Sequence, residues 1–194
     1  IIKFFFTEIC QKLLKNGFSS EKIFHDLYVQ KPDGSFSQID IAIVTEVGII
    51  VIEVKHLSGW IFGTGNQSKW VQVLAYGKQK FSFYNPIFQN NSHIRFLRSR
   101  LSNIEDIPFY SLIVFYGDCV LKDLSLIPSE TSIVKSDDVI VTIKNLIQTG
   151  KELTYTNLAE IEAILFESVN HGEDRDIRLQ HAENIQKKWN STNF

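Results

Sequence analysis

The stretch that most constrains this chain is QIDIAIVTEVGIIVIEVKH, residues 38–56. Two runs rich in β-branched residues flank a short turn around Glu46, which is the pattern of a β-hairpin. A sequence this apolar belongs at the centre of a buried sheet. It nevertheless carries Asp40, Glu53 and Lys55, and charged side chains are costly to bury unless they are paired.

The hairpin itself predicts where these charges lie. A turn centred between Glu46 and Val47 places Asp40 directly opposite Glu53. Opposed side chains on antiparallel strands lie roughly 4.5–5.5 Å apart at Cβ. Lys55 is two residues beyond Glu53 and therefore points to the same face. A bulge in the turn would shift the first relation by one residue but would leave the second intact.

Two facing carboxylates in an apolar sheet repel one another and need compensation. One acid can keep its proton, Lys55 can pair with an acid, or a divalent cation can lie between Asp40 and Glu53. Mg²⁺ prefers oxygen ligands and usually takes only one or two protein carboxylates. The alternative is a solvated strand face or a structural ion pair of little net stability. The apolar flanking residues argue against an ordinary solvent face.

The rest of the chain alternates helical and strand patterns. It predicts an α/β protein with helices against a mixed sheet, in the order helix, three strands, helix, strand, helix. We expect residues 59–69 to be loop-rich and the tail 173–189 to be a helix or partly disordered. The expected strands are 22–30, 38–45, 48–57, 70–75, 80–84, 111–117 and an edge strand at 132–136; the expected helices are 2–16, 86–102, 137–149 and 156–169.

Composition limits the partners. The chain has 194 residues and a net charge of −2, so no global basic field draws it onto nucleic acid, and any polyanion must meet a local patch. The two cysteines, Cys10 and Cys119, lack metal-ligand spacing, which favours a reducing compartment and hence the cytoplasm. The apolar opening IIKFFF is too short for a membrane span, so no membrane partner is expected.

Asp40 followed by Glu53-Val54-Lys55 resembles the signature of the PD-(D/E)XK nuclease superfamily. The surrounding text, SQIDIAIVTEVGIIVIEVKHLSGWIFG, then KW at 69–70 and NPIFQNNSHIRFLRSRL, resembles the nuclease-related domain, NERD. The likeness runs from about Thr7 to Ile147. It implies a restriction-endonuclease-like mixed central sheet flanked by helices, with an αβββαβ core. Residues 1–150 would form the nuclease domain, and 151–194 a helical extension packed on it or trailing from it.

The resemblance implies a phosphodiester hydrolase that uses Mg²⁺ or Mn²⁺. Asp40 and Glu53 would be metal ligands together with the Val54 carbonyl, and Lys55 would position the attacking water. Thr7 and Ile41 stand where the family commonly has Gly and His. The implied catalytic set also includes an acid on the first helix and a glutamine in NPIFQ: Asp40, Glu53, Lys55, Gln89 and Glu8.

Basic residues near Gln89 predict where nucleic acid would bind. His93 lies one helical turn after Gln89, and Arg95 and Arg98 are neighbours on a helix surface. With Lys78 and Lys80 of the preceding loop, the arginines could meet phosphates beside the metal. His93 could act as a general base or contact a phosphate. The plainer interpretation is that the arginines only solubilise the helix. No feature indicates base readout, so little sequence specificity is expected. DNA is the expected substrate, ahead of RNA.

Other functions fit the same sequence. A module that binds nucleic acid or protein could retain the nuclease fold without cutting. A structural or regulatory role, with the tail 173–189 as an interaction segment, is a third hypothesis. Cleavage of both strands by a chain with one site would favour a homodimer.

Overall fold

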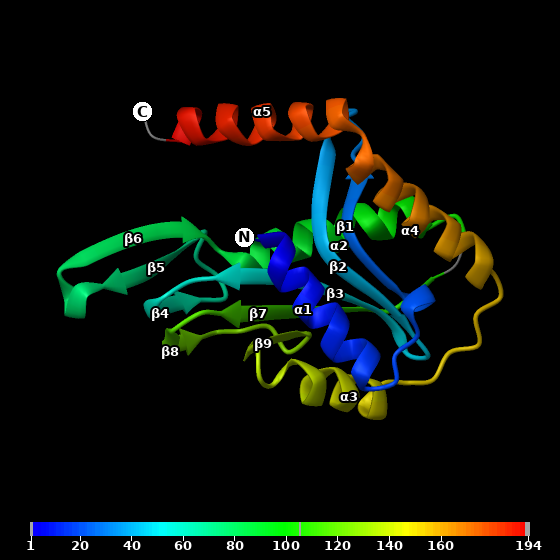
Figure 1. Cartoon of the computed structure of the whole chain (residues 1–194), viewed down its shortest axis with the longest axis horizontal. Coiled ribbons are helices and arrows are strands. Elements are labelled where there is room, and N and C mark those ends of the chain that lie inside the picture. The colour runs from blue at the N-terminus through cyan, green and yellow to red at the C-terminus, as the bar shows by residue number, and fades with distance from the viewer. Residues whose placement is uncertain (1, 105, 193–194) are drawn as a thin grey trace.

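The computed structural model describes the backbone of residues 2–104 and 106–192, and the side chains of residues 7–74, 76–104 and 106–187. Its centre is a five-stranded sheet in the order β1-β2-β3-β7-β9 (Figure 1). The first three strands are antiparallel, while β7 is parallel to both β3 and β9. The bounds are β1 Ile23–Gln30, β2 Phe36–Thr45, β3 Gly48–His56, β7 Phe109–Tyr116 and β9 Thr131–Lys135. The predicted hairpin and the predicted edge strand are both confirmed.

Helices cover both faces of this sheet, as Figure 1 shows. One face packs against α1 and α3, and the other against α2 and α4. The helices are α1 Ile2–Lys15, α2 Pro86–Leu101, α3 Val139–Thr149, α4 Leu158–Glu173 and α5 Arg175–Thr192. Together with the central sheet they form the predicted α/β architecture, with the αβββαβ order of α1, β1, β2, β3, α2 and β7 at its core.

A second sheet stands beside the first, with the strand order β6-β5-β4-β8. Its strands are β4 Gly59–Thr64, β5 Lys69–Leu74, β6 Gln79–Tyr84 and β8 Cys119–Ser125. The expectation that residues 59–69 are loop-rich was wrong for the first six of them, because β4 pairs with β5 on one side and β8 on the other. Gly63 suits this position, since a Cβ there would meet the Trp70 ring at 2.2 Å.

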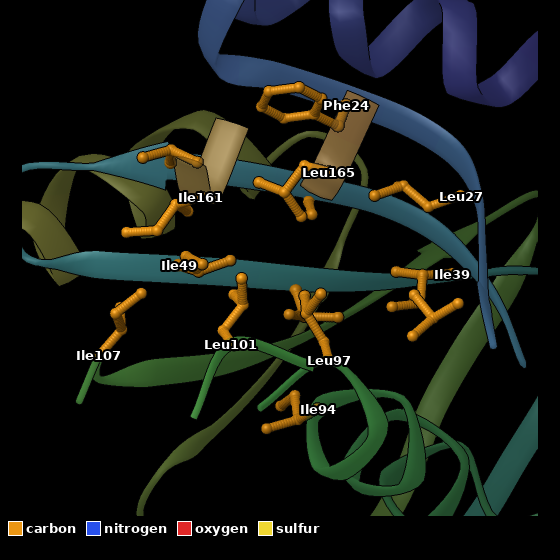
Figure 2. Packing of buried hydrophobic residues seen from close by; sticks show 14 residues of the cluster. Phe24, Leu27, Ile39, Ile49, Ile94, Leu97, Leu101, Ile107, Ile161 and Leu165 are labelled. Atoms are coloured by element: carbon orange, nitrogen blue, oxygen red, sulfur yellow. The ribbon is translucent and has the colours of Figure 1, made fainter. Parts of the chain in front are cut away.

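Figure 2 shows the core on the α2 side of the central sheet. Leu97 and Leu101 of α2 and Leu165 of α4 lie against strand residues such as Ile49, and all four are at most 1% exposed. Helix α4 is therefore part of the main core, although it lies in the segment 151–194 that the sequence predicted to be an extension. The boundary at residue 150 stays a prediction.

The start of α2 is fixed by one side chain. Asn85 caps the helix by accepting a hydrogen bond from the N–H of Ile87 at 2.9 Å, and Pro86 occupies the first helical turn. The Asn85 amide also donates to the carbonyls of Thr64 and Gln67 at 3.1 and 2.6 Å. The N-terminus of α2 is thus tied to the second sheet.

Among the residues that the structure describes, no helix is both long enough and apolar enough to cross a membrane.

The packing of α4 gives a stability prediction. Leu165→Ala should lower the free energy of unfolding by about 2–5 kcal/mol, because it removes a fully buried side chain and leaves a cavity. Its neighbour Phe166 is 61% exposed, so Phe166→Ala should change stability by no more than about 0.5 kcal/mol. Urea unfolding of both variants measures the difference. Equal, small losses would show that α4 does not belong to the core.

Candidate active site

The hairpin register is the predicted one up to the site. Pairs run from Thr45 with Gly48 to Ile41 with Ile52, without a bulge at Gly48. Asp40 and Glu53 are the next positions in this register, but the ladder stops before them. The Oδ2 atom of Asp40 instead accepts a hydrogen bond from the backbone N–H of Val54 at 2.7 Å. A carboxylate therefore takes the place of a main-chain acceptor on this flank of β3.

The other edge of β2 is interrupted at the same point. The ladder between β1 and β2 runs His25 with Ile41 and then Leu27 with Ile39, and it passes over Asp26 and Asp40. Asp26 has φ +56°, in the left-handed region that only a few per cent of non-glycine residues adopt. The distortion is local, since regular pairing resumes on both sides. It leaves Asp40 bound to β3 through its side chain.

Glu53 and Lys55 project toward α2, as their shared strand face predicts. The Lys55 ammonium donates to Glu53 Oε1 at 2.6 Å and to Gln89 Oε1 at 2.8 Å. Glu53 is only 2% exposed, whereas Lys55 is half-buried. The structure thus brings the acid, the lysine and the helix glutamine into one cluster, joined through a single ammonium group.

His93 completes the cluster from the next turn of α2. Its Nε2 atom lies 3.2 Å from Glu53 Oε2, and its Nδ1 shares a hydrogen bond of 2.8 Å with the hydroxyl of Ser37 on β2. His93 was predicted to meet a phosphate, but it is buried and faces Glu53 instead. Ser37 was missed, because a lone serine in a strand carries no signal for such a contact.

Asn90 is a second residue that the sequence analysis missed. Its amide donates to the Val51 carbonyl and to the Ser111 hydroxyl, each at 2.9 Å, and its side chain is fully buried. These contacts hold α2 to the two central strands of the sheet. They therefore fix the distance between α2 and the sheet at Gln89, the preceding residue, and at His93, three residues further on.

The two acids have opposite electrostatic surroundings. Burial, and then the nearby charge of Glu53, raise the pKa of Asp40 well above its ordinary value of 3.8, although the Val54 N–H and Lys55 act in the other direction. Burial also disfavours the ionised form of Glu53, but Lys55 and His93 outweigh it and lower the pKa of that carboxyl. Glu53 is therefore the stable anion, and Asp40 is the acid that lacks compensating charge.

This donor set fits a small divalent cation. Two carboxylates stand next to each other, and the unrelieved repulsion at Asp40 is what a cation between them would remove. Within the described part of the chain, no group of three or more His, Cys, Asp or Glu side chains is arranged to hold a metal. Two carboxylates suffice for Mg²⁺, which keeps several waters. The Val54 carbonyl as a third ligand stays a prediction.

Glu8 is not brought to this cluster. Helix α1 covers the opposite face of the sheet, and Glu8 forms an ion pair with Lys12 at 3.0 Å, one turn along the same helix. Its charge acts on Tyr116, at the end of β7, where burial, then Glu8, raise the pKa of the phenol. The resemblance implied a catalytic role for Glu8. That role stays a prediction, because no contact between Glu8 and the cluster around Glu53 is seen among the described residues.

The predicted phosphate contacts separate into two groups. Arg95 and Arg98 lie on the flank of α2 away from Gln89, where they line a surface pocket of about 260 Å³ with Phe109 and Glu130. Lys78 and Lys80 are exposed at the β5–β6 hairpin. Arg95 and Arg98 follow Gln89 by six and nine residues, so they lie on other sides of α2 than Gln89. Their contact with a phosphate stays a prediction.

Comparisons with known proteins fit this geometry. The family model described as "Nuclease-related domain" matches residues 4–116, which include most of α1, the hairpin and all of α2. An uncharacterized protein of Bacillus anthracis, pXO1-01, is 28% identical over 185 residues, which cover 92% of this chain and 83% of that protein. No solved structure matches the chain. Because the family model covers more than half of the sequence and contains the whole cluster around Glu53, the chain belongs to the nuclease-related domain (NERD) family.

Proposed function

We propose that this protein is a metal-dependent nuclease that hydrolyses phosphodiester bonds in DNA with little sequence specificity. The observation that carries the proposal is the Lys55 ammonium, which bridges Glu53 and Gln89 beside the second carboxylate, Asp40. This group of a buried acid with a partly exposed acid, lysine and amide offers ligands, a positive charge and a hydrogen-bond donor within one small volume.

Asp40 and Glu53 would hold Mg²⁺ or Mn²⁺. When bound, such an ion supplies Lewis-acid polarisation of a phosphoryl oxygen and lowers the pKa of a coordinated water. Lys55 has three N–H donors and gives two of them to Glu53 and Gln89. The third can orient a water or neutralise charge that develops on the phosphate. Because Gln89 turns Oε1 toward Lys55, its NH₂ group is directed away and can donate to a phosphate oxygen.

A non-cutting module is the second candidate, and one observation favours it. Both oxygens of Glu53 already face a nitrogen, Lys55 Nζ at 2.6 Å and His93 Nε2 at 3.2 Å. The cluster is therefore partly compensated within the chain itself. Binding of nucleic acid without cleavage would fit this alternative. If the protein does cut both strands of a duplex, two copies, one for each strand, would fit the homodimer that the sequence analysis predicted.

The nuclease proposal gives a prediction about cleavage. The purified protein should nick supercoiled plasmid DNA with Mg²⁺ or Mn²⁺ and not with EDTA. Lys55→Ala should reduce the rate by about 100-fold or more, because it removes a positioned donor and charge. Lys151→Ala, which removes an exposed lysine from the loop before α4, is the matched control and should cut like the parent.

Circular dichroism of Lys55→Ala accompanies the assay, since the variant leaves Glu53 with His93 alone. A folded variant that nicks as fast as the parent would show that the cluster is not the active site. A parent that does not nick DNA or cleave RNA with either metal would contradict the nuclease proposal.

The second prediction concerns charge at Asp40. Its folded-state pKa is raised, so ionisation costs stability in the folded chain. Asp40→Asn should therefore unfold at a higher temperature than the parent at neutral pH without divalent cations. The difference should shrink as pH falls and vanish below the ordinary pKa of 3.8, where the acid is protonated in both states.

A bound divalent cation should reverse this order and make the parent more stable than Asp40→Asn. Mg²⁺ or Mn²⁺ at about 100 times its dissociation constant should stabilise the parent by about 2.7 kcal/mol, and should stabilise Asp40→Asn much less, because the variant lacks one ligand charge. Thermal unfolding with and without the ion measures both effects. Equal stabilisation of parent and variant would place any bound cation elsewhere.

A further inference from the structure

The charges of this chain are strongly segregated along the sequence. Residues 54–104 contain seven Lys or Arg and no Asp or Glu, whereas the rest of the chain carries all 22 acids and only 13 basic residues. The acid-free segment begins directly after Glu53 and ends with α2. It includes the end of β3, strands β4, β5 and β6, and the whole of α2. A protein with a net charge of −2 therefore has a stretch of 51 residues in which every charged side chain is basic.

Within this region, the second sheet packs one face against the core near α2 and β7, although Phe81 at the end of that face is 51% exposed. Trp70 and Ile61 are buried against Ile87 and Phe115 on the inner face. Side chains alternate along a strand, so the residues between them point the other way. We call this other side the outer sheet face and define it by Trp60, Lys69, Lys80 and Tyr84, with buried Val73 between Trp60 and Lys80.

The strand register places these residues side by side. Lys80 on β6 is opposite Val73 on β5, which is opposite Trp60 on β4, and Tyr84 is opposite Lys69. Trp60 is 36% exposed and Tyr84 is 52% exposed. The Lys122 ammonium lies over the Trp60 ring at 5.1 Å from its centroid, and buried Val73 separates Trp60 from Lys80. The outer sheet face thus combines lysines with one exposed ring, Tyr84, and one partly exposed ring, Trp60. The nearest acid in this sheet is Asp123, on β8 at the edge away from β6.

The outer sheet face is continuous with the candidate active site. Tyr84 ends β6, and two residues later Pro86 begins α2. The Tyr84 ring contacts that of Phe88 edge to face, with centroids 6.5 Å apart. Phe88 is the residue before Gln89, which binds Lys55. Figure 1 shows the β5–β6 hairpin extending outward from this point.

Exposed rings and lysines have a common ligand. Solvated aromatic side chains stack on unpaired bases, and lysines beside them neutralise phosphates, with little dependence on sequence. Paired bases in a duplex present only their edges, so rings on an open sheet gain nothing from them. A protein partner of acidic character would use the lysines but would leave the exposed Tyr84 ring beside Lys69 unexplained.

We propose that the outer sheet face binds single-stranded nucleic acid, so that the substrate of this protein is a strand with an unpaired stretch. This rests on the proposed nuclease function for the identity of the reaction, but the binding surface is separate from the residues around Glu53. An unpaired segment would run over the hairpin and reach the scissile phosphate next to Gln89 at the start of α2.

Binding is measured by fluorescence anisotropy in EDTA, which prevents cleavage. The probes are a labelled DNA oligonucleotide, the same strand annealed to its complement, and an RNA of the same sequence. The single strand should bind at least about fivefold more tightly than the duplex. Tighter binding of either DNA or RNA single strand supports the proposal, and the two arms identify the kind of nucleic acid.

Variants of the outer sheet face test where binding occurs. Tyr84→Leu should weaken single-strand binding by about fivefold or more, which is the lower end of the effect of losing one base–aromatic stack. Phe166→Leu, at an exposed ring on α4, is its control. The double variant Lys69→Ala/Lys80→Ala should reduce the slope of log K against log salt by about 1.4, while Lys15→Ala/Lys151→Ala should leave the slope unchanged.

The outcomes separate this inference from the nuclease proposal. Duplex binding as tight as single-strand binding, or hairpin variants that behave like their controls, would overturn the inference even if plasmid nicking is confirmed. The predicted binding pattern without any cleavage would support the inference and contradict the nuclease proposal.

Discussion

The contact on which the candidate site depends is the one between the Lys55 ammonium and two oxygens, Glu53 Oε1 and Gln89 Oε1. It joins β3 to α2 across the face of the sheet and gives a buried carboxylate its main counter-charge. Removing a partner from such a pair leaves a charge in a low-dielectric interior, which is costly. The remaining polar contacts of the cluster are arranged around this one.

Two asparagines make that contact possible. Asn85 caps α2 and ties its first turn to the second sheet, and Asn90 fastens the next residues to β3 and β7. Both are fully buried and use amide groups to satisfy backbone carbonyls. Because α2 is held at these two points, Gln89 needs no large adjustment to reach Lys55. The site is built on a strand and a helix, which position side chains more tightly than loops do.

Much of this could be read from the sequence because the decisive information is local. The length of the turn set the register of β2 and β3, and with it the shared face of Glu53 and Lys55. The helical period and the Asn-Pro start placed α2 and its glutamine. The break of β2 at Asp40 was not predictable, because it depends on the left-handed backbone of Asp26 on a different strand.

The errors came from long-range information. Strand β4 was taken for a loop because it is glycine-rich and its partner β8 lies about sixty residues away. The role of Glu8 rests on the resemblance alone and stays a prediction, since no local pattern says which face of the sheet α1 covers. His93 was placed at a phosphate because its burial against Ser37 and Glu53 follows only from the packing of α2 on the sheet.

The insertion of strands β4 to β6 between β3 and α2 has a consequence for how this architecture can vary. Lys55 and Gln89 touch although they are 34 positions apart, and their meeting is fixed at the two ends of that interval by β3 and by the cap of α2. The hairpin between these anchors, whose turn carries the exposed Tyr76, can lengthen or shorten without moving either anchor. Relatives that share the site can therefore differ in spacing here, and a sequence search with a fixed gap would overlook them.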